Sequence, residues 1–161
     1  MFPDDIVKSA QQAQSHWTTY DEDGLIESTV FASVTLAQWA LESSYGKFMP
    51  HGSNNPFGIK ATDGEAFVVA WTQEFKDGKY IKIPQKFARY ASIDQAFDAH
   101  AKLLATSGYY VKAQHDNNPE KYATDLTGIY ATDPNYGSKL ISIIRANTLT
   151  QYDLKQEITN G

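Results

Sequence analysis

The sequence predicts one α+β domain, in which helical segments flank a single small antiparallel hairpin. Apolar residues recur at helical spacing near the N-terminus and again through the second half of the chain. Between them, a stretch rich in β-branched and aromatic residues contains the turn sequence Lys-Asp-Gly-Lys. Helices and strands that are segregated along a chain are typical of α+β folds. The 161 residues fit a single domain, 1–161, with a polar tail from about residue 153.

The N-terminal part predicts two helices. Residues 4–20 begin after Pro3, which suits a first helical turn, and carry apolar side chains at helical spacing. Residues 21–24 form an acidic turn. A second helix is expected from residue 28 or 32 to residue 45, because Gly46 is a natural helix-ending residue.

In the middle of the chain, the sequence predicts a loop that is followed by strands. Residues 48–59 hold prolines, glycines and two adjacent asparagines, which favour a loop. Residues 66–74 and 80–83 are expected to pair as strands around a turn at 76–79, and residues 86–90 are expected to form a short third strand after a proline.

Three helices are expected after this hairpin. Ser92 is a candidate N-cap for the first, with Gln95 at the position of a capping box. The second is expected over residues 119–127, and the third from Pro134, after the capping residue Asp133.

Charge and composition exclude several classes of function. The net charge is −5 and there is no cluster of basic residues, so we expect no nucleic-acid partner. There are no cysteines, and the four histidines show no metal-binding spacing, so no metal or other cofactor is expected. We find no signal peptide and no membrane anchor, so a target outside the cytoplasm requires another export route. A monomer is expected.

Glu42 is the first candidate for chemistry. It is the only acid or base near neutrality between Val30 and Tyr45, in a helix with almost no polar side. Burying a lone carboxylate is costly, and burial raises its pKa, which suits a general acid near neutral pH. The alternative is a solvated surface glutamate, and from the helix pattern alone the two interpretations carry equal weight.

Other candidates have plain structural explanations as well. Glu74, just before the hairpin turn, could be a solubilising strand residue or a second carboxylate facing Glu42, and paired carboxylates are what glycoside hydrolysis needs. Spacing does not choose between Glu74 and four other acids: Asp63, Glu65, Asp77 and Asp94. The loop with Asn54, Asn55 and Phe57 could bind a sugar or form an ordinary Asx turn. Tyr130 is not needed for the following helix start and could project into a cleft.

Five segments, in this order, resemble motifs of the family 73 glycoside hydrolases, which are bacterial and phage peptidoglycan N-acetylglucosaminidases. Residues 33–46 resemble "LAQAALESGWG", and residues 54–60 resemble "NNLFGIK". Residues 72–78, 86–90 and 128–136 resemble "TTEYENG", "KFRVY" and "GYATDPxY". The match covers most of the chain, and five motifs in register are highly specific.

The resemblance implies a lysozyme-like fold with a cleft between a helical lobe and a β-hairpin lobe. It implies cleavage of the β-1,4 bond after N-acetylglucosamine in peptidoglycan glycan strands. Glu42 matches the family's general acid, Glu74 its second glutamate, and Tyr130 a tyrosine near the reacting sugar. Ile129 stands between Gly128 and Tyr130, so the last motif is one residue longer here. Substrate binding is assigned to five residues: Asn54, Asn55, Phe57, Tyr45 and Trp71.

Several alternatives stay open at this stage. An inverting, a retaining or a substrate-assisted mechanism would each use Glu42 as the acid. A lytic transglycosylase or muramidase of the same fold, or a non-catalytic wall-binding phage module, are competing functions. The short acidic chain favours a phage endolysin, or a delivered effector, that is made in the cytoplasm and released to the cell wall.

Overall fold

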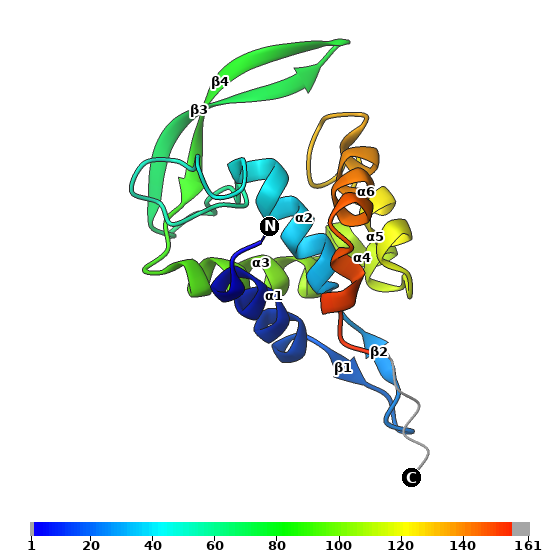
Figure 1. Ribbon diagram of the computed structural model, residues 1–161. Helices are drawn as coiled ribbons and strands as arrows, with labels where there is room; N and C mark the ends of the chain where they lie inside the picture. Colours follow the sequence, from blue (N-terminus) through cyan, green and yellow to red (C-terminus); the bar gives the residue numbers. More distant parts are fainter. Residues whose placement is uncertain (1, 156–161) are drawn as a thin grey trace.

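A helical body and a protruding hairpin make up the structure, a computed structural model that describes residues 2–155 (Figure 1). The long elements, in chain order, are α1 (Asp4–His16), α2 (Ala32–Ser43), β3 (Phe67–Lys76), β4 (Lys79–Ala88), α3 (Ile93–Thr106) and α6 (Tyr136–Ala146). The short elements are β1 (Thr19–Tyr20), β2 (Ile26–Ser28), η1 (Gly108–Tyr110), α4 (Val111–Gln114), α5 (Pro119–Asp125) and η2 (Leu149–Tyr152). This is the α+β arrangement that the sequence predicts.

Helix α2 is the centre of the body. It packs against α1, α5, α6 and η2, and every residue from 32 to 40 is buried. A helix that is covered on all sides needs no polar face, which explains the weak amphipathicity of its sequence. Its last turn emerges from the core, so Glu42 lies where buried and exposed surroundings meet.

The first turn of α2 is capped by residues from distant parts of the chain. The side-chain oxygen of Gln14 accepts the Ala32 N–H at 3.1 Å, and the carboxylate of Asp153 accepts the Ser33 N–H at 2.7 Å. A negative charge at a helix N-terminus is favourable. The same Gln14 oxygen accepts the Leu154 N–H, so ordered contacts continue past the predicted start of the polar tail. The rest of that predicted tail, residues 156–161, lies outside the described residues.

The long hairpin pairs β3 with β4 in one unbroken register, from Phe67 opposite Ala88 to Lys76 opposite Lys79. Asp77 and Gly78 both have positive φ angles, 53° and 80°, as a type I′ turn requires. The third strand predicted for residues 86–90 is wrong, because β4 runs straight through Pro84. A two-stranded sheet leaves a free edge on each strand, so a missing N–H is tolerated there.

Two other boundaries differ from the prediction. The first helix ends at His16, and Thr19–Tyr20 instead pairs with Ile26–Ser28 around the acidic turn, where the Asp21 carboxylate accepts two backbone N–H groups. The last helix begins at Tyr136, because the Asp133 side chain closes a turn by accepting the Asn135 N–H at 2.8 Å. Both deviations come from local side-chain bonding that competes with the helix.

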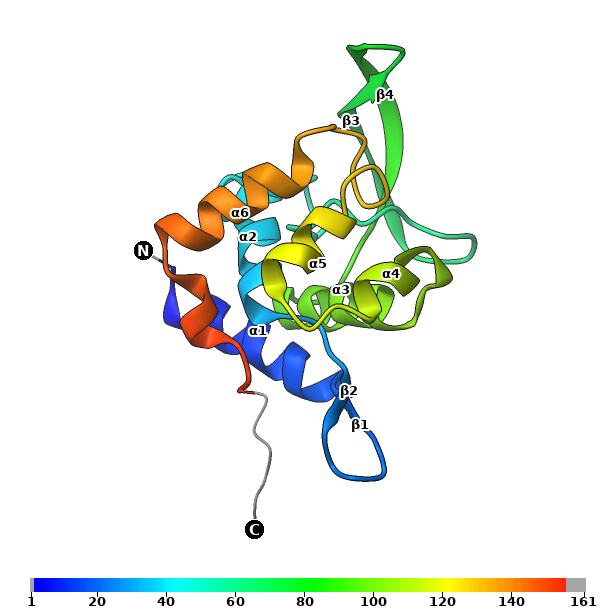
Figure 2. The same cartoon turned by 90° about the vertical axis from the view of Figure 1, so that its right-hand side faces the viewer.

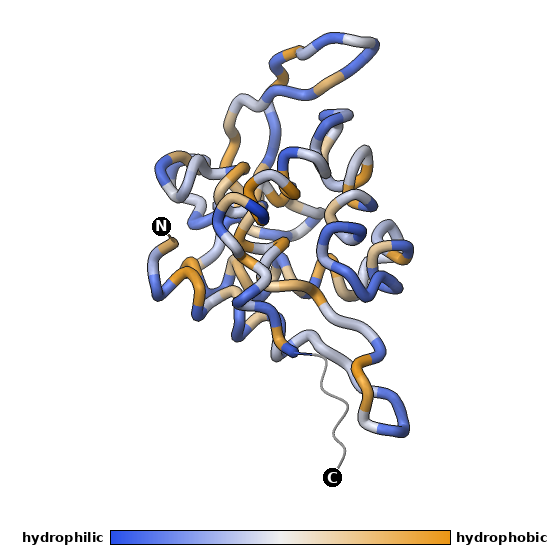
Figure 3. The backbone as a smooth tube through the Cα atoms, turned by 45° about the vertical axis from the view of Figure 1, so that its right-hand side comes forward, coloured by the Kyte–Doolittle hydropathy of each residue, from blue (hydrophilic) through white to orange (hydrophobic). Residues whose placement is uncertain are grey.

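The hydrophobic core runs through the helical body, and the hairpin and the loops carry more hydrophilic residues (Figure 3). Its largest fully buried side chains include Tyr122, Tyr136, Phe57, Phe97 and Leu36. No helix within residues 2–155 has the length and apolar character needed to cross a membrane.

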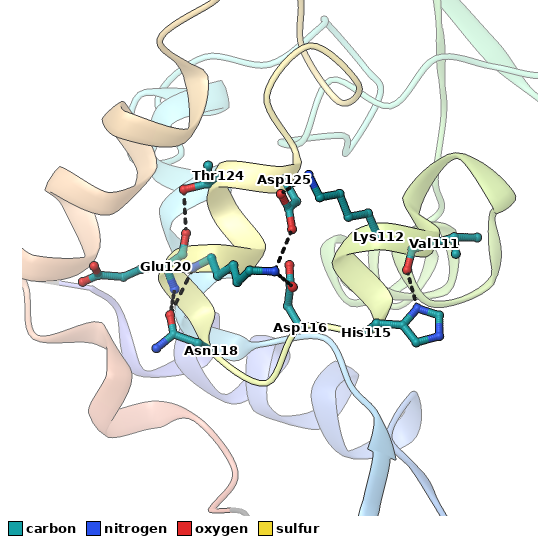
Figure 4. Close-up of polar contacts among 9 residues, drawn as sticks. Val111, Lys112, His115, Asp116, Asn118, Glu120, Thr124 and Asp125 are labelled. Carbon is teal, nitrogen blue, oxygen red and sulfur yellow. Dashed lines mark hydrogen bonds and ion pairs between the residues drawn. The ribbon is translucent and has the colours of Figure 1, made fainter.

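A polar network fastens α4 to α5 on the flank of the body (Figure 4). Lys121 lies 2.9 Å from a carboxylate oxygen of Asp116 and 3.9 Å from one of Asp125, and Lys112 pairs with Asp125 at 3.3 Å. Burial, and the hydrogen bond that the protonated Asp116 carboxyl donates to the Asp125 carboxylate, raise the pKa of Asp116. These residues do not line the cleft described below, so the network is structural.

Candidate active site

A cleft of about 590 Å³ lies between the end of α2, the long hairpin and the loop that precedes α6. Figure 2 shows that loop and the hairpin on the same side of the helical body. The lining includes Glu42, Gly58, Lys60, Glu74, Tyr130, Thr132 and Tyr136. Three elements that are far apart in sequence therefore contribute to one concave surface.

Glu42 lies in this cleft at the edge of the helical body, where the residue as a whole is exposed but protein atoms surround its carboxyl group. Its pKa is raised from 4.5 to about 7, and desolvation by burial is the main cause. A hydrogen bond from the Tyr136 hydroxyl lowers the pKa, and the negative charge of Glu74 raises it. The surroundings thus keep Glu42 protonated close to neutral pH, as proton donation requires.

A buried chain of hydrogen bonds supports Glu42 from behind. His100 Nε2 lies 2.9 Å from Gln38 Oε1, and burial lowers the pKa of His100 to about 3, so a neutral imidazole donates this bond. Gln38 Nε2 then donates to the Tyr136 hydroxyl at 3.1 Å. Because the Tyr136 oxygen accepts that bond, its own proton points to Glu42. All three supporting side chains are almost completely buried.

Gly58 gives the Glu42 carboxyl its space. It has a φ of +66°, and a Cβ atom built there would lie 3.2 Å from Glu42 Oε2. A side chain at this position would crowd the carboxyl in a strained backbone conformation. The sequence motif around Asn54 thus contributes a small residue at the cleft as well as a loop.

Glu74 faces the same cleft from β3. Lys60 Nζ lies 3.3 Å from one of its carboxylate oxygens, and the Thr132 hydroxyl donates to the other at 2.9 Å. Thr132 Oγ1 also accepts the Phe75 N–H at 2.8 Å, so it joins the hairpin to the loop before α6. A cation and a hydroxyl donor thus hold the Glu74 carboxylate in place at the cleft.

Tyr130 lines the cleft with its ring, while its hydroxyl is bonded elsewhere. The hydroxyl donates to the Phe57 carbonyl at 2.7 Å, and the ring stacks on Tyr136 with centroids 5.8 Å apart. Burial raises the pKa of Tyr130 well above its ordinary value. Tyr130 therefore contributes an uncharged, fixed aromatic wall next to Glu42.

Three of the predicted substrate-binding residues have structural contacts. Asn55 is fully buried, and its amide bonds four backbone groups, at Phe57, Ile59 and Ala88. Phe57 is fully buried against Phe97 and His100. Asn54 donates to the Tyr90 carbonyl. These contacts shape the loop that presents Gly58, and leave Asn55 and Phe57 no exposed surface for a ligand.

The other two predicted binding residues lie away from the cleft lining. Tyr45 packs against Phe2 and Trp39 just beyond α2. Trp71 is 72% exposed on β3, three residues before Glu74 and therefore on the opposite face of the strand. The structure thus brings Glu42, Glu74 and Tyr130 together, and leaves Tyr45 and Trp71 outside that group.

Five residues that support the two carboxylates, Thr132 among them, were not singled out from the sequence. In the sequence, three of them stand among apolar residues at helical spacing: Tyr136, Gln38 and His100. A polar atom in such an apolar stripe is the one feature that could have marked them as buried hydrogen-bonding residues. Lys60 closes the "NNLFGIK"-like segment but has no partner near it in sequence. Within residues 2–155 no group of three or more potential metal ligands is found.

Comparison with known proteins identifies the family. The family model described as mannosyl-glycoprotein endo-beta-N-acetylglucosaminidase matches residues 19–149, which is most of the chain. The chain belongs to this glucosaminidase family. The matched region includes Glu42, Glu74 and Tyr130, and its relatives assign the domain to glycoside hydrolase family 73. The resemblance seen in the sequence motifs is confirmed.

Individual relatives of this glucosaminidase-family domain carry different names. It is 38% identical over 142 residues to a probable N-acetylmuramidase of Lactococcus lactis subsp. lactis (strain IL1403), covering 83% of this chain and 31% of that protein. It is 34% identical over 131 residues to the exo-glucosaminidase LytG of Bacillus subtilis (strain 168), covering 77% of this chain and 46% of that protein. The chain thus spans less than half of the length of these relatives.

A solved structure agrees over nearly the full length of both chains. A peptidoglycan hydrolase mutant from Sphingomonas sp. A1 matches with a TM-score of 0.70 and 30% identity, covering 92% of each chain. The lysozyme-like α+β fold that the resemblance implied is thereby confirmed.

Proposed function

We propose that this domain hydrolyses the β-1,4 bond after N-acetylglucosamine in the glycan strands of bacterial peptidoglycan. The observation that carries the proposal is the environment of Glu42, a cleft carboxyl whose pKa is raised to about 7 and which faces a second, ion-paired carboxylate. An acid that is protonated near neutral pH, with a second carboxyl group across the same cleft, is the pairing that glycoside hydrolysis uses.

In this proposal Glu42 donates its proton to the glycosidic oxygen as the bond from that oxygen to the sugar C1 breaks. Water then adds to C1, which leaves a reducing-end N-acetylglucosamine. Glu74 either takes a proton from this water or stabilises positive charge on the sugar while the deprotonated Glu42 takes it. In a substrate-assisted route the oxygen of the 2-acetamido group first bonds to C1 as the glycosidic bond breaks, and water then opens the ring that this forms, giving its proton to Glu42. Tyr136 keeps the Glu42 carboxyl oriented, and the Tyr130 ring forms the adjacent wall.

Product analysis tests both the bond and the reaction. Purified peptidoglycan is digested, and the new chain ends are identified by mass spectrometry. We expect reducing-end N-acetylglucosamine. Anhydromuramic acid would assign a lytic transglycosylase, reducing-end muramic acid would assign a muramidase, and no new ends would assign a binding module. The naming of one relative as a muramidase and of another as a glucosaminidase makes this the decisive measurement.

Glu42→Gln tests the acid. A proton donor of this kind contributes about 100- to 10,000-fold to the rate, so the variant should lose that much of its release of reducing ends. Glu27→Gln, at an exposed position on β2, is the matched control and should retain full activity. Full activity in Glu42→Gln, with an intact fold, would remove the assignment.

The site of action is part of the same proposal. We propose that the domain acts at the cell wall, either as a phage endolysin or as a delivered effector, and as a monomer. Expression inside a bacterial host should leave the cells intact until the membrane is permeabilised, and lysis should then follow. Lysis of intact cells by externally added protein, at a rate independent of permeabilisation, would contradict an inside-acting enzyme.

A further inference from the structure

The outer face of the long hairpin is a second surface with a chemistry of its own. Alternate residues of a strand point to opposite sides of a sheet, and Glu74 and Thr72 line the cleft on one side. The alternate set of residues defines the outer hairpin face: Phe67, Val69, Trp71 and Gln73 on β3, with Lys82 and Lys86 on β4. Gln73 lies at its edge and also lines the cleft.

Apolar side chains on this face are strongly exposed. Trp71 is 72% exposed, Val69 62% and Phe67 44%, on a hairpin that projects from the helical body in both ribbon views (Figures 1 and 2). A row of exposed apolar residues on one face of a sheet marks an interaction surface. Trp71, Gln73 and Lys82, together with Thr72, also line a concavity of about 530 Å³.

The polar residues on this face indicate what it binds. Lys82 and Lys86 are its charged members, and none of the six residues is acidic, although the whole chain carries a net charge of −5. The Lys86 ammonium lies 4.7 Å from the centre of the Phe67 ring. An indole ring, an amide and ammonium groups together suit a polymer that offers flat sugar faces, hydroxyl groups and carboxylates.

We propose that the outer hairpin face binds a second peptidoglycan glycan strand, which lies next to the strand held in the cleft. The inference rests on the proposed function and extends it to a further binding site. Trp71 stacks on a sugar ring, Gln73 hydrogen-bonds to its substituents, and Lys82 and Lys86 pair with carboxylates of the stem peptides. Trp71 and Lys82 line only the outer concavity and Glu74 lines only the cleft, while Thr72 and Gln73 lie at the edge that the two share.

The expected consequence is retention on insoluble wall. A domain that holds a neighbouring strand stays near uncut bonds after each cleavage, whereas a short soluble glycan fills only the cleft. Loss of the outer face should therefore reduce binding to sacculi and the rate on sacculi, and leave the rate on soluble glycan fragments unchanged.

The test measures binding with the proposed acid disabled. Trp71→Ala and the double variant Trp71→Ala/Lys82→Gln are made in the Glu42→Gln background and sedimented with purified sacculi. We expect Trp71→Ala to weaken binding about tenfold, since burial of one ring face is lost, and the double variant to weaken it further. The matched controls are Tyr109→Ala, an aromatic residue 81% exposed on η1, and Lys8→Gln on α1, which should bind normally.

Two further arms identify the ligand. Sacculi with amidated carboxylates should remove the difference made by Lys82→Gln but keep that made by Trp71→Ala. Vesicles of phosphatidylglycerol and phosphatidylcholine should show no binding that depends on Trp71. Unchanged sacculus binding in the double variant, or a Trp71-dependent binding to vesicles alone, would overturn the inference.

These outcomes are separate from a failure of the proposed function. If the wild-type domain releases reducing ends and the Trp71 variants bind sacculi as tightly as the parent, only the outer-face inference falls. If the wild-type domain releases no new chain ends while Trp71 still governs sacculus binding, only the proposed hydrolysis falls. Thermal unfolding of each variant shows whether the exposed substitutions leave the fold intact.

Discussion

The helical body and the long hairpin each supply one carboxyl group to the cleft, and the surroundings of the two groups differ in burial and in charge. Glu42 emerges from the most deeply buried helix, and its neighbours are uncharged aromatic and amide groups. Glu74 lies on a projecting sheet, and a cation and a hydroxyl hold it. Burial favours the protonated form of the first, whereas an ion pair with Lys60 and a hydrogen bond from Thr132 hold the second in position.

The difference shows how one cleft obtains an acid and a carboxylate from the same residue type. The helical body around Glu42 must be rigid, because a carboxyl group keeps a raised pKa only while protein groups take the place of water around it. The hairpin side has few contacts with the core, and it is tied to the body through Lys60 and Thr132. The predictions below change one side at a time.

Substituting the two glutamates compares the two sides directly. Glu42→Gln should lose about 100- to 10,000-fold in rate, and Glu74→Gln should lose less, because the hairpin carboxylate acts after or alongside proton transfer. The measurement is release of reducing ends from peptidoglycan. A loss of less than about tenfold in Glu74→Gln would favour assistance by the 2-acetamido group. Equal losses would contradict the division of roles.

The raised pKa of Glu42 predicts how stability depends on pH. The folded state holds this proton up to about pH 7, whereas an unfolded chain releases it near 4.5. The contribution to stability is therefore present below pH 4.5 and is lost as the pH rises to about 7. Glu42→Gln should lack that loss and be more stable than the wild type at pH 8. Chemical unfolding at pH 4 and pH 8 measures this, and parallel pH profiles would contradict it.

Tyr136→Phe removes the donor to Glu42 and the acceptor for Gln38. An unpaired buried amide should cost about 1–3 kcal/mol of the unfolding free energy. Loss of the hydrogen bond should raise the pKa of Glu42 further, so the alkaline limb of the activity profile should move to higher pH. Tyr122→Phe is the matched control, because the buried Tyr122 hydroxyl has no partner among the described residues. A shift in both variants would show a general effect of removing a phenol.

Thr132→Ala loosens the hairpin and should have the smallest effect. It removes the acceptor of the Phe75 N–H and the donor to Glu74, worth about 0.5–1.5 kcal/mol in total because both bonds are exposed. Amide hydrogen exchange should become faster at Phe75 and stay unchanged within α2. Thr124→Ala, whose hydroxyl bonds within α5, serves as the control. Unchanged exchange at Phe75 would show that the hairpin is held by other contacts.

The sequence predicted those turns and helix starts that depend on the identity of a few adjacent residues. The Asp77-Gly78 turn, the Ser92 cap, which accepts the Gln95 N–H at 3.2 Å, and the start of α5 at Pro119 depend on neighbouring residues only. Boundaries at His16 and Tyr136 were displaced by side-chain bonds that no helix pattern reveals. Pro84 suggested a strand break, yet the two-stranded sheet accommodates it at a free edge.

The sequence by itself determined the α+β class, the family and the placement of Glu42 in an unusually apolar helix, because these depend on periodicity and on motifs within short segments. Only the tertiary structure decided what surrounds each candidate. It placed Lys60 and Thr132 on Glu74, turned Trp71 away from the cleft, buried Asn55 and Phe57, and lined up His100, Gln38 and Tyr136 behind Glu42. Burial and pairing set a pKa, and both arise from residues that are distant in the chain until it folds.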